Sequence, residues 1–404
     1  MVDVQAGLVR SGNVEDAPVV VYVQQLLEQA ITLQASDLHF EPYEQFYRVR
    51  MRIDGHLREV ANAPMAFRER LAARIKVMAR LDVAEKRLPQ DGRIQLRLDN
   101  ERHLDLRVST LPTLFGEKVV VRLLDTRTGQ LQLAQLGYEA EDLRVLEQTI
   151  RRPHGMVLVT GPTGSGKTQS LYACLNQLNT SEVNIATVED PCEIQMPGIN
   201  QLNVQDKPGL SFAVALRAFL RQDPDILMVG EIRDLETAQV AVQAAQTGHM
   251  VLSTLHTNDA PSTLVRLRNM GVPSYNIAAS VSLITAQRLA RKLCPSCKQP
   301  YQITGQTLRK AGHLDADESS QYTVFQPVGC TACHKGFKGR TGIFQIMPIS
   351  TAMQELILDD CSNAAIAELA RQEGLRSLRE AGMRKVLAGV TSLDEVLTAT
   401  RSEH

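Results

Sequence analysis

The sequence predicts an α/β protein whose core is a largely parallel sheet, preceded by a smaller α+β domain. Three observations lead to this prediction. Short apolar strands alternate with helical segments from Leu143 onward, which is typical of a parallel sheet that binds its ligand at the carboxyl edge. One strand-to-helix turn reads GPTGSGKT, residues 161–168, and the strands before residue 125 follow one another as hairpins. With 404 residues, the chain is long enough for two or three domains.

The composition is that of an ordinary soluble globular protein, with 44% hydrophobic and 22% charged residues. Lys and Arg (44) nearly balance Asp and Glu (45), so the net charge of −1 demands no polyanionic partner. The sequence holds no apolar run of 18 residues and does not begin with the basic-then-apolar pattern of a secretory signal. We therefore expect a cytoplasmic protein without a transmembrane helix.

The smaller domain is predicted at residues 15–125, after a flexible tail of residues 1–14. Apolar residues recur there at helical spacing in two segments, and strand-like alternation surrounds the hairpin signal Asp54-Gly55. A weakly patterned linker, 126–137, is predicted to follow. We expect helices at 19–33 and 67–81, and strands at 47–53, 56–60, 92–98, 104–109 and 116–124.

The core is predicted to occupy residues 138–404. After Ala290 the amino-acid composition becomes rich in Cys, Lys, Gly and Gln, which indicates a separate module at 290–345. Helices are expected again at 348–401, with Gly374 and Gly389 as helix stops. The apolar strands of the core are expected to begin near residues 156, 184, 225 and 250.

GPTGSGKT has the form of a phosphate-binding P-loop, because an apolar strand precedes it and a helical segment follows. Its glycines allow the backbone to turn with positive φ, so that successive N–H groups point at an anion. We expect Lys167 to reach the β- and γ-phosphates of ATP and the Thr168 hydroxyl to bind Mg²⁺. The predicted nucleotide-binding residues of this loop are Gly161, Pro162, Thr163, Gly164, Ser165, Gly166, Lys167 and Thr168.

Two acidic strand ends are candidates for the chemistry at the γ-phosphate. The apolar strand 226–229 resembles a Walker B strand, but Gly230 stands where an Asp is usual, so Glu231 must serve the metal or the water. The strand 185–188 ends in Glu189, our first choice to polarise the attacking water. Each acid has an alternative interpretation as a solvated loop carboxylate.

Two histidines, His249 and His256, flank the apolar strand that begins at residue 250. Their position in a P-loop domain suggests γ-phosphate sensing, for which His256 is the better candidate. A purely structural role at the strand ends is the alternative.

Two CxxC pairs, separated by 32 residues, indicate a metal site. Four thiolates complete a tetrahedral Zn²⁺ shell and leave no open position, so we expect a structural zinc. The predicted ligands are Cys294, Cys297, Cys330 and Cys333. The remaining cysteines, at positions 174, 192 and 361, are isolated and are predicted to be packing residues.

Together these motifs resemble the secretion ATPases of bacterial type II secretion and type IV pilus assembly. GPTGSGKT, VEDPCE (188–193), GEIRD (230–234) and TGHMVLSTLHTND (247–259) are similar to that family's Walker A, Asp box, Walker B and His box. ASDLHFEP (35–42) and RVSTLPTLFGEKVVVRLLD (107–125) are similar to its second N-terminal domain. The resemblance extends from about Glu15 to the C-terminus. It implies a RecA-like P-loop ATPase core.

The resemblance also implies a cytoplasmic homohexamer that hydrolyses ATP to drive pilin or pseudopilin assembly. Its expected partners are an inner-membrane platform protein and other assembly components, with peripheral membrane association and no nucleic acid. Family members usually carry a further N-terminal domain that docks onto an inner-membrane protein. Only some fourteen residues precede the matching part here, so we expect either a short variant or a truncated chain.

Arginines from the N-terminal domain contact the phosphates in this family. Arginine suits that role because its planar fork spreads charge over the developing γ-phosphate. Arg107 and Arg122 are the predicted phosphate ligands, and Arg48 and Arg50 are further candidates. Positions 48, 50 and 52 share one strand face, so the alternative for each arginine is a solvated side chain.

Two other functions remain as alternatives. A hexameric nucleic-acid translocase or helicase would need a basic channel with aromatic residues, whereas aromatics make up 4% of this chain and Trp is absent. A small-molecule kinase is disfavoured by the accompanying N-terminal domain, by the cysteine module and by the absence of a second substrate motif.

Overall fold

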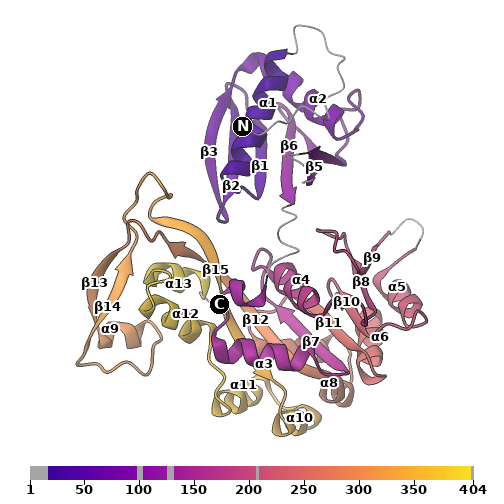
Figure 1. Ribbon diagram of the computed structural model, residues 1–404, viewed down its shortest axis with the longest axis vertical. Helices are drawn as coiled ribbons and strands as arrows, with labels where there is room; N and C mark the ends of the chain where they lie inside the picture. Colours follow the sequence, from indigo (N-terminus) through magenta and orange to yellow (C-terminus); the bar gives the residue numbers. More distant parts are fainter. Residues whose placement is uncertain (1–16, 98–102, 125–131, 206–208, 402–404) are drawn as a thin grey trace. The chain divides into compact units, whose positions relative to one another are not determined.

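The computed structural model describes residues 17–97, 103–124, 132–205 and 209–401, which fall into two compact units, 1–127 and 128–404 (Figure 1). The predicted tail, 1–14, lies outside the described residues. Each unit has its own hydrophobic core.

The first unit is an antiparallel sheet with two helices, as the hairpin pattern predicted. Its six strands are ordered β3-β2-β1-β6-β5-β4, so the strand containing ASDLHFEP lies in the middle. The elements are α1 (Ala17–Thr32), β1 (Asp37–Pro42), β2 (Tyr47–Ile53), β3 (His56–Ala63), the 3-10 helix η3 (Met65–Phe67), α2 (Arg68–Met78), β4 (Gln90–Arg97), β5 (His103–Thr113) and β6 (Gly116–Leu124).

The two faces of this sheet differ because side chains alternate along each strand. On β2, Tyr47, Val49 and Met51 are fully buried and belong to the core that also contains apolar residues of α1 and α2. Arg48 and Arg50, between them, point to the opposite face, where they meet the buried carboxylate of Glu41 on β1. One face is therefore apolar and packed, and the other is ionic.

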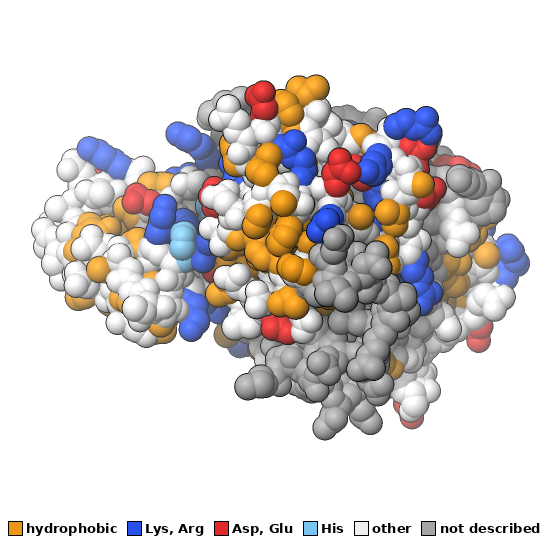
Figure 2. Space-filling view, turned by 90° about the horizontal axis from the view of Figure 1, so that it is seen from above, with side chains coloured by type: hydrophobic (Ala, Val, Ile, Leu, Met, Phe, Trp, Pro, Cys, Tyr) orange, Lys and Arg blue, Asp and Glu red, His pale blue; other side chains and the backbone are white. Residues whose placement is uncertain are grey.

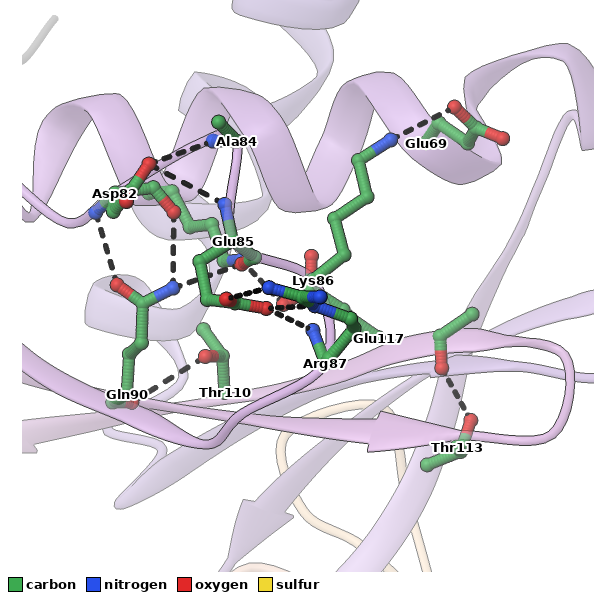
Figure 3. Close-up of polar contacts among 12 residues, drawn as sticks. Glu69, Asp82, Ala84, Glu85, Lys86, Arg87, Gln90, Thr110, Thr113 and Glu117 are labelled. Atoms are coloured by element: carbon green, nitrogen blue, oxygen red, sulfur yellow. Dashed lines mark hydrogen bonds and ion pairs between the residues drawn. The ribbon is translucent and has the colours of Figure 1, made fainter.

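The loop between α2 and β4 is held by a local polar network (Figure 3). The Asp82 N–H donates to Gln90 Oε1 at 2.9 Å, and Gln90 Nε2 donates back to the Asp82 carbonyl at 2.9 Å. Beneath the loop, Lys76 is fully buried, forms an ion pair with Glu117 and donates to the Glu85 carbonyl at 2.6 Å. A buried ammonium is tolerated only with such partners, so this pair ties α2 to β6 and to the loop.

The second unit is built on a seven-stranded sheet, ordered β15-β12-β7-β11-β10-β8-β9, in which all neighbours from β12 to β9 are parallel. Strand β15 closes one edge in antiparallel pairing with β12. The strands are β7 (Gly155–Thr160), β8 (Ile185–Glu189), β9 (Asn200–Asn203), β10 (Ile226–Val229), β11 (Met250–Leu255), β12 (Val281–Leu293) and β15 (Phe337–Pro348), with the separate hairpin β13 (Gln299–Thr304) and β14 (Gln321–Gln326).

Helices cover both faces of this sheet. Along β7, Met156 and Leu158 pack with residues of α5–α8, α10 and α11, whereas Val157 and Val159 pack with residues of η5, α3 and α4. This two-sided burial explains why the strand is continuously apolar. The helices are η5 (Leu133–Leu136), α3 (Ala140–Ile150), α4 (Lys167–Leu178), α5 (Phe212–Phe219), α6 (Leu235–Gln246), α7 (Ala260–Asn269), α8 (Ser274–Ser280), α9 (Gly305–Lys310), α10 (Thr351–Leu358), α11 (Asn363–Gln372), α12 (Leu378–Leu387) and α13 (Leu393–Ala399).

The C-terminal helices end where their glycines predicted. Gly374 has φ +91° and follows α11, and Gly389 has φ +65° and follows α12. The left-handed conformation suits glycine because it has no Cβ. Residues 126–131 of the predicted linker, 126–137, lie outside the described residues. Its remaining part contains η5, whose Leu133 is 3% exposed and packs in the core of the second unit.

The surface combines apolar and basic side chains on the face seen in Figure 2. Exposed apolar residues of the first unit include Phe46, Leu111 and Leu114, the last 89% exposed at the turn between β5 and β6. None of the helices in the described part of the chain is long and apolar enough to span a bilayer.

Candidate nucleotide site and tetracysteine centre

The P-loop follows β7, and its last two residues, Lys167 and Thr168, begin α4, as its sequence predicted. Gly161, Gly164 and Gly166 have φ of +145°, +80° and +90°. A Cβ on Gly161 would lie 2.5 Å from the carbonyl oxygen of Gln287, so only glycine fits there. Lys167 folds back over the loop, and its Nζ donates to the carbonyls of Gly161 at 2.7 Å and Pro162 at 3.1 Å.

The remaining loop positions divide between exposed and buried. Pro162, Thr163 and Gly164 are exposed, Ser165 is 4% exposed, and Thr168 is half-buried in the first turn of α4. The N-terminus of this helix favours anions, because its first N–H groups carry partial positive charge.

The carboxyl ends of three neighbouring strands bring an ionic chain to the same sheet edge. Glu231, after β10, forms an ion pair with Arg233, and its Oε2 lies 3.5 Å from Nε2 of His256, after β11. Arg233 also approaches Asp190, after β8, with 3.7 Å between Nη1 and Oδ2. Glu231 and His256, which were predicted separately, are thus brought together, and Arg233 links Glu231 to Asp190.

The charges at this edge influence one another. Burial lowers the pKa of Lys167 to about 8, with the charge of Glu231 opposing the shift and that of Arg288 adding to it. Burial and the charge of Lys167 also lower the pKa of His256. Lys167, Glu231 and His256 therefore belong to one electrostatic site.

The structure gives a physical reason for Gly230 in place of the usual Asp. A Cβ at this position would lie 3.3 Å from the Cα of Glu189 and 3.4 Å from the carbonyl oxygen of Val188. The Gly230 N–H also donates to that carbonyl at 2.8 Å, which holds the two backbones close. These distances are tighter than most Cβ contacts, so the close approach of the two backbones suits glycine at this position.

Glu189 is 4% exposed, and both of its carboxylate oxygens accept hydrogen bonds. Tyr172 donates to Oε2 at 2.5 Å, and Thr187 and Gln201 donate to Oε1 at 2.7 Å and 3.3 Å. Burial raises the pKa of Tyr172, and the Glu189 charge raises it further, so Tyr172 keeps its proton for this bond. The predicted role of Glu189 in polarising water stays a prediction.

His249 is not brought to the P-loop. It precedes β11, whereas His256 follows that strand, and β11 runs parallel to β7 with its carboxyl end beside Thr160. The ring Nδ1 of His249 lies 3.0 Å from the Ala244 carbonyl near the end of α6. The structural role considered for this histidine fits its position.

The four predicted zinc ligands converge although they come from two separated CxxC pairs. All four Sγ atoms lie within 4.8 Å of one another. The Sγ–Sγ distance is 3.9 Å for Cys294–Cys330 and 3.6 Å for Cys297–Cys333. Tetrahedral Zn²⁺ with Zn–S bonds of about 2.3 Å places its sulfurs about 3.8 Å apart, so the cluster fits zinc.

Backbone N–H groups support the same cluster. Gly329 donates to the Cys297 sulfur at 3.4 Å, and Cys330 donates to the Cys333 sulfur at 3.3 Å. Such bonds favour thiolates, the form that binds metal. Cys174, by contrast, lies on α4 and is buried in the core, as expected of a packing residue.

The predicted arginines of the first unit have different surroundings. Arg48 and Arg50 both bind Glu41, with Nε–Oε2 distances of 3.1 Å and 2.8 Å. Burial alone would raise the pKa of Glu41, but Arg50 and Lys118 outweigh it and lower this pKa to about 2. These two arginines therefore serve an ion-pair cluster.

Arg107 and Arg122 instead belong to a row of basic residues across the sheet. Arg107 on β5 stands directly opposite Arg122 on β6, and Arg93 on β4 stands opposite Arg107. The Arg122 side chain is 58% exposed, and its Nε lies 2.9 Å from Oδ1 of Asp37. The other carboxylate oxygen of Asp37, Oδ2, lies 3.6 Å from Nε of Arg52. Three arginines therefore stand opposite one another on β4, β5 and β6, with Asp37 of β1 opposite Arg122.

Sequence reasoning assigned no role to several residues that the structure places at the nucleotide site. Arg233 and Asp190 lie within the motifs, and their charge was the available signal. Gln287 and Arg288 lie on β12 and contact the P-loop and the loop after His256, respectively. Polar residues recur along β12, at Ser282, Thr285, Arg291 and Lys292 as well, so nothing in the sequence singles out these two.

Comparisons with known proteins agree with the motifs. The family described as "Type II/IV secretion system protein" matches residues 12–398. The type IV pilus assembly ATPase PilB of Acinetobacter baylyi is 54% identical over 387 residues, covering 96% of this chain and 67% of that relative. Type II secretion system protein E of Pseudomonas aeruginosa is 49% identical over 390 residues, covering 96% of this chain and 77% of that relative.

Solved structures share the fold. The pilus retraction motor PilT with bound ADP has a TM-score of 0.64 at 23% identity, covering 94% of this chain and 97% of that one. The ATPase DotB of Legionella pneumophila has a TM-score of 0.69 at 20% identity, covering 94% and 95%. The predicted α/β fold is confirmed. The chain belongs to the type II/IV secretion system protein family, among the secretion and pilus assembly ATPases, as its motifs predicted.

Proposed function

We propose that this chain is the subunit of a cytoplasmic homohexameric motor that hydrolyses ATP to drive pilin or pseudopilin assembly at the inner membrane. One observation carries the catalytic part: Lys167 in a P-loop and the Glu231–His256 pair share one edge of a parallel sheet and influence each other's charge. The names of the relatives support the coupling to pilus assembly or type II secretion.

The P-loop residues would bind ATP. Backbone N–H groups from Gly161 to Thr168 would hold the phosphates at the N-terminus of α4, and the Lys167 ammonium would bind the β- and γ-phosphates. The Thr168 hydroxyl and the Glu231 carboxylate are oxygen donors of the kind Mg²⁺ prefers, so these residues would hold it. When bound, Mg²⁺ offsets the negative charge of the phosphates.

Glu231 is the proposed residue for orienting the attacking water, because its carboxylate lies at the sheet edge beside His256. His256 would sense the γ-phosphate from the same edge. Glu189 is a second proposed acid, and it would have to give up a hydrogen bond from Tyr172, Thr187 or Gln201 to accept one from water.

Arg107 and Arg122 are proposed to contact the phosphates during hydrolysis. Their guanidinium groups, opposite each other on β5 and β6, would place positive charge beside the γ-phosphate, where negative charge develops during hydrolysis. The inner-membrane platform protein is the proposed partner, with zinc at Cys294, Cys297, Cys330 and Cys333 stabilising the C-terminal module.

Lys167→Ala tests the catalytic proposal. ATP hydrolysis should fall by at least about 100-fold, because the phosphates lose their cation, while circular dichroism and the melting temperature stay close to those of the unsubstituted protein. Lys310→Ala, an exposed lysine on α9, is the matched control. Retained hydrolysis by Lys167→Ala would overturn the assignment of the site.

The partner is tested by stimulation of ATP turnover. A detergent-solubilised inner-membrane platform protein should increase the rate, and single-stranded DNA or RNA should not. A rate of ATP turnover that increases with nucleic acid and not with the platform protein would favour a translocase instead. Capture of the platform protein from native membranes would then separate pilus assembly from secretion.

A further inference from the structure

We propose that Gln287 and Arg288, adjacent residues of β12, position the P-loop and the loop that carries His256 relative to each other. This inference rests on the proposed ATP chemistry of the second unit. Neither residue is proposed to touch the nucleotide; both act through the loops that they hold.

Gln287 uses both ends of its side-chain amide on the P-loop segment. Its Nε2 donates to the carbonyl of Ser165 at 2.7 Å, and its Oε1 accepts from the Ser170 hydroxyl at 2.8 Å. The side chain is 2% exposed, so an unbonded amide would cost free energy at this position. These two bonds fix the P-loop and the first turn of α4 to a strand more than 100 residues away in sequence.

The backbone of β12 also limits where the P-loop can move. A Cβ on Gly161 would meet the Gln287 carbonyl oxygen at 2.5 Å, and one on Gly166 would meet Gln287 Nε2 at 3.3 Å and the Leu289 side chain at 3.6 Å. The loop therefore rests directly on this strand at both of its ends.

Arg288 serves the neighbouring loop. Its Nη2 donates to the backbone carbonyl of Asn258 at 2.9 Å and reaches Asn258 Oδ1 at 3.3 Å, while its Nη1 donates to the Gln287 carbonyl at 3.0 Å. Asn258 is two residues after His256, so the guanidinium connects the strand to the histidine loop. A fork of several N–H donors is needed for this arrangement, which favours arginine over lysine.

A second polar side chain of the same strand pair supports the histidine loop. Gln345 on β15 stands opposite Ala286 in register, is 7% exposed, and its Oε1 accepts from the Ala260 N–H at 2.9 Å. The segment from His256 to Ala260 is thus held by β12 at its middle residue, Asn258, and by β15 at Ala260.

Adjacent residues of a strand point to opposite faces, which explains how one strand serves two loops. Any shift of β12 would displace the P-loop and the His256 loop together. The two loops contribute Lys167 and His256, whose mutual distance decides whether a bound phosphate and the Glu231–His256 pair meet in a reactive geometry.

The test compares Gln287→Met with Arg288→Met and Arg288→Lys in the full chain. Nucleotide affinity is measured with a fluorescent ATP analogue, and kcat with a phosphate-release assay. Gln287→Met should weaken nucleotide binding about tenfold, because the P-loop loses its anchor. Arg288→Met should lower kcat at least about tenfold and change affinity less than about threefold, because it leaves the P-loop in place and releases the His256 loop. Arg288→Lys should recover part of kcat.

The matched control is Arg291→Met on the same strand. Arg291 is bound to Glu395 on α13, with Nη2–Oε2 at 2.6 Å, so its loss disturbs β12 without touching either loop. Unchanged affinity and kcat in this control support the proposal. Equal effects in all three methionine variants would assign them to strand stability and overturn it, as would wild-type behaviour of the Gln287 and Arg288 variants. If the unsubstituted chain neither binds nor hydrolyses ATP, it is the proposed function that fails.

Discussion

Arg107 on β5 and Arg122 on β6 stand directly opposite each other, so two like charges share one register position of neighbouring strands. Asp37 on β1 forms an ion pair with Arg122, with 2.9 Å between Asp37 Oδ1 and Arg122 Nε. Two guanidinium groups at one position of a sheet can together bind the oxygens of a phosphate, the role proposed for them above.

Arg107→Gln and Arg122→Gln should each lower kcat for ATP about 100-fold or more, since an arginine that contacts the transferred phosphate supplies a large rate factor. Steady-state kinetics of both variants checks this. Arg87→Gln in the same unit is the control, because the Arg87 side chain is 87% exposed and forms an ion pair with the neighbouring Glu85 (Figure 3). A loss of rate in the control equal to that in the two variants would contradict a role at the phosphates.

Acid should weaken the first unit through Glu41. The pKa of this carboxyl is about 2 in the folded protein, below its usual value of about 4.3, so the charged form stabilises the fold. That contribution is fully present above about pH 4.5 and is lost as the pH falls towards 2, amounting to at most about 3 kcal/mol. Urea unfolding of the first unit, followed by its transition midpoint at several values between pH 6 and pH 2.5, measures this loss of stability.

Glu41→Gln provides the comparison for this acid effect. The variant should be less stable at pH 6 and should lose less stability on acidification, because it has no carboxyl to protonate. If both proteins showed the same slope of stability with pH, another group would be responsible.

Lys76→Met should destabilise the first unit by about 3–5 kcal/mol, because it leaves the Glu117 carboxylate buried without its cation. Denaturant unfolding measures the change. The double variant Lys76→Met with Glu117→Leu should recover most of the loss, since a buried ion pair can be exchanged for apolar groups at little net cost. Additive losses in the double variant would show that the two side chains act independently.

Cys330→Ser should lower the zinc content of the purified protein and expose residues 290–345 to proteolysis, while the nucleotide affinity changes less than about threefold. A structural zinc stabilises the fold around it and takes no part in phosphate chemistry. Metal analysis and peptide mapping after limited proteolysis check both parts. Cys361→Ser, which removes an isolated cysteine, should behave as the unsubstituted chain does. Unchanged zinc content and unchanged proteolysis in Cys330→Ser would refute the structural zinc.

Local patterns of the sequence carried most of the fold. The alternation from Tyr47 to Ile53 predicted β2 with its observed bounds, and the glycines of the P-loop have the positive φ that the motif requires. The two CxxC pairs also predicted a cluster that forms across more than 30 residues. In each case the determining interaction is local or the spacing itself encodes the geometry.

Contacts between distant segments could not be predicted in this way. Nothing around Gln287 indicates that its amide binds Ser165, and nothing around Glu189 indicates that Tyr172 and Gln201 occupy its oxygens. His249 and His256 were both candidates for γ-phosphate sensing, with His256 preferred, and the direction of β11 places only His256 at the end of the strand beside the P-loop. These outcomes depend on strand order, which tertiary packing decides.

The close approach of β10 to β8 at Gly230 limits how this site could change. Introducing the missing aspartate there would put a Cβ 3.3 Å from the Cα of Glu189 and 3.4 Å from the Val188 carbonyl oxygen, so the neighbouring strand would have to give by a few tenths of an ångström. The acidic group of this chain instead stands one residue later, at Glu231, on the turn that follows β10, the strand that pairs with both β11 and β8.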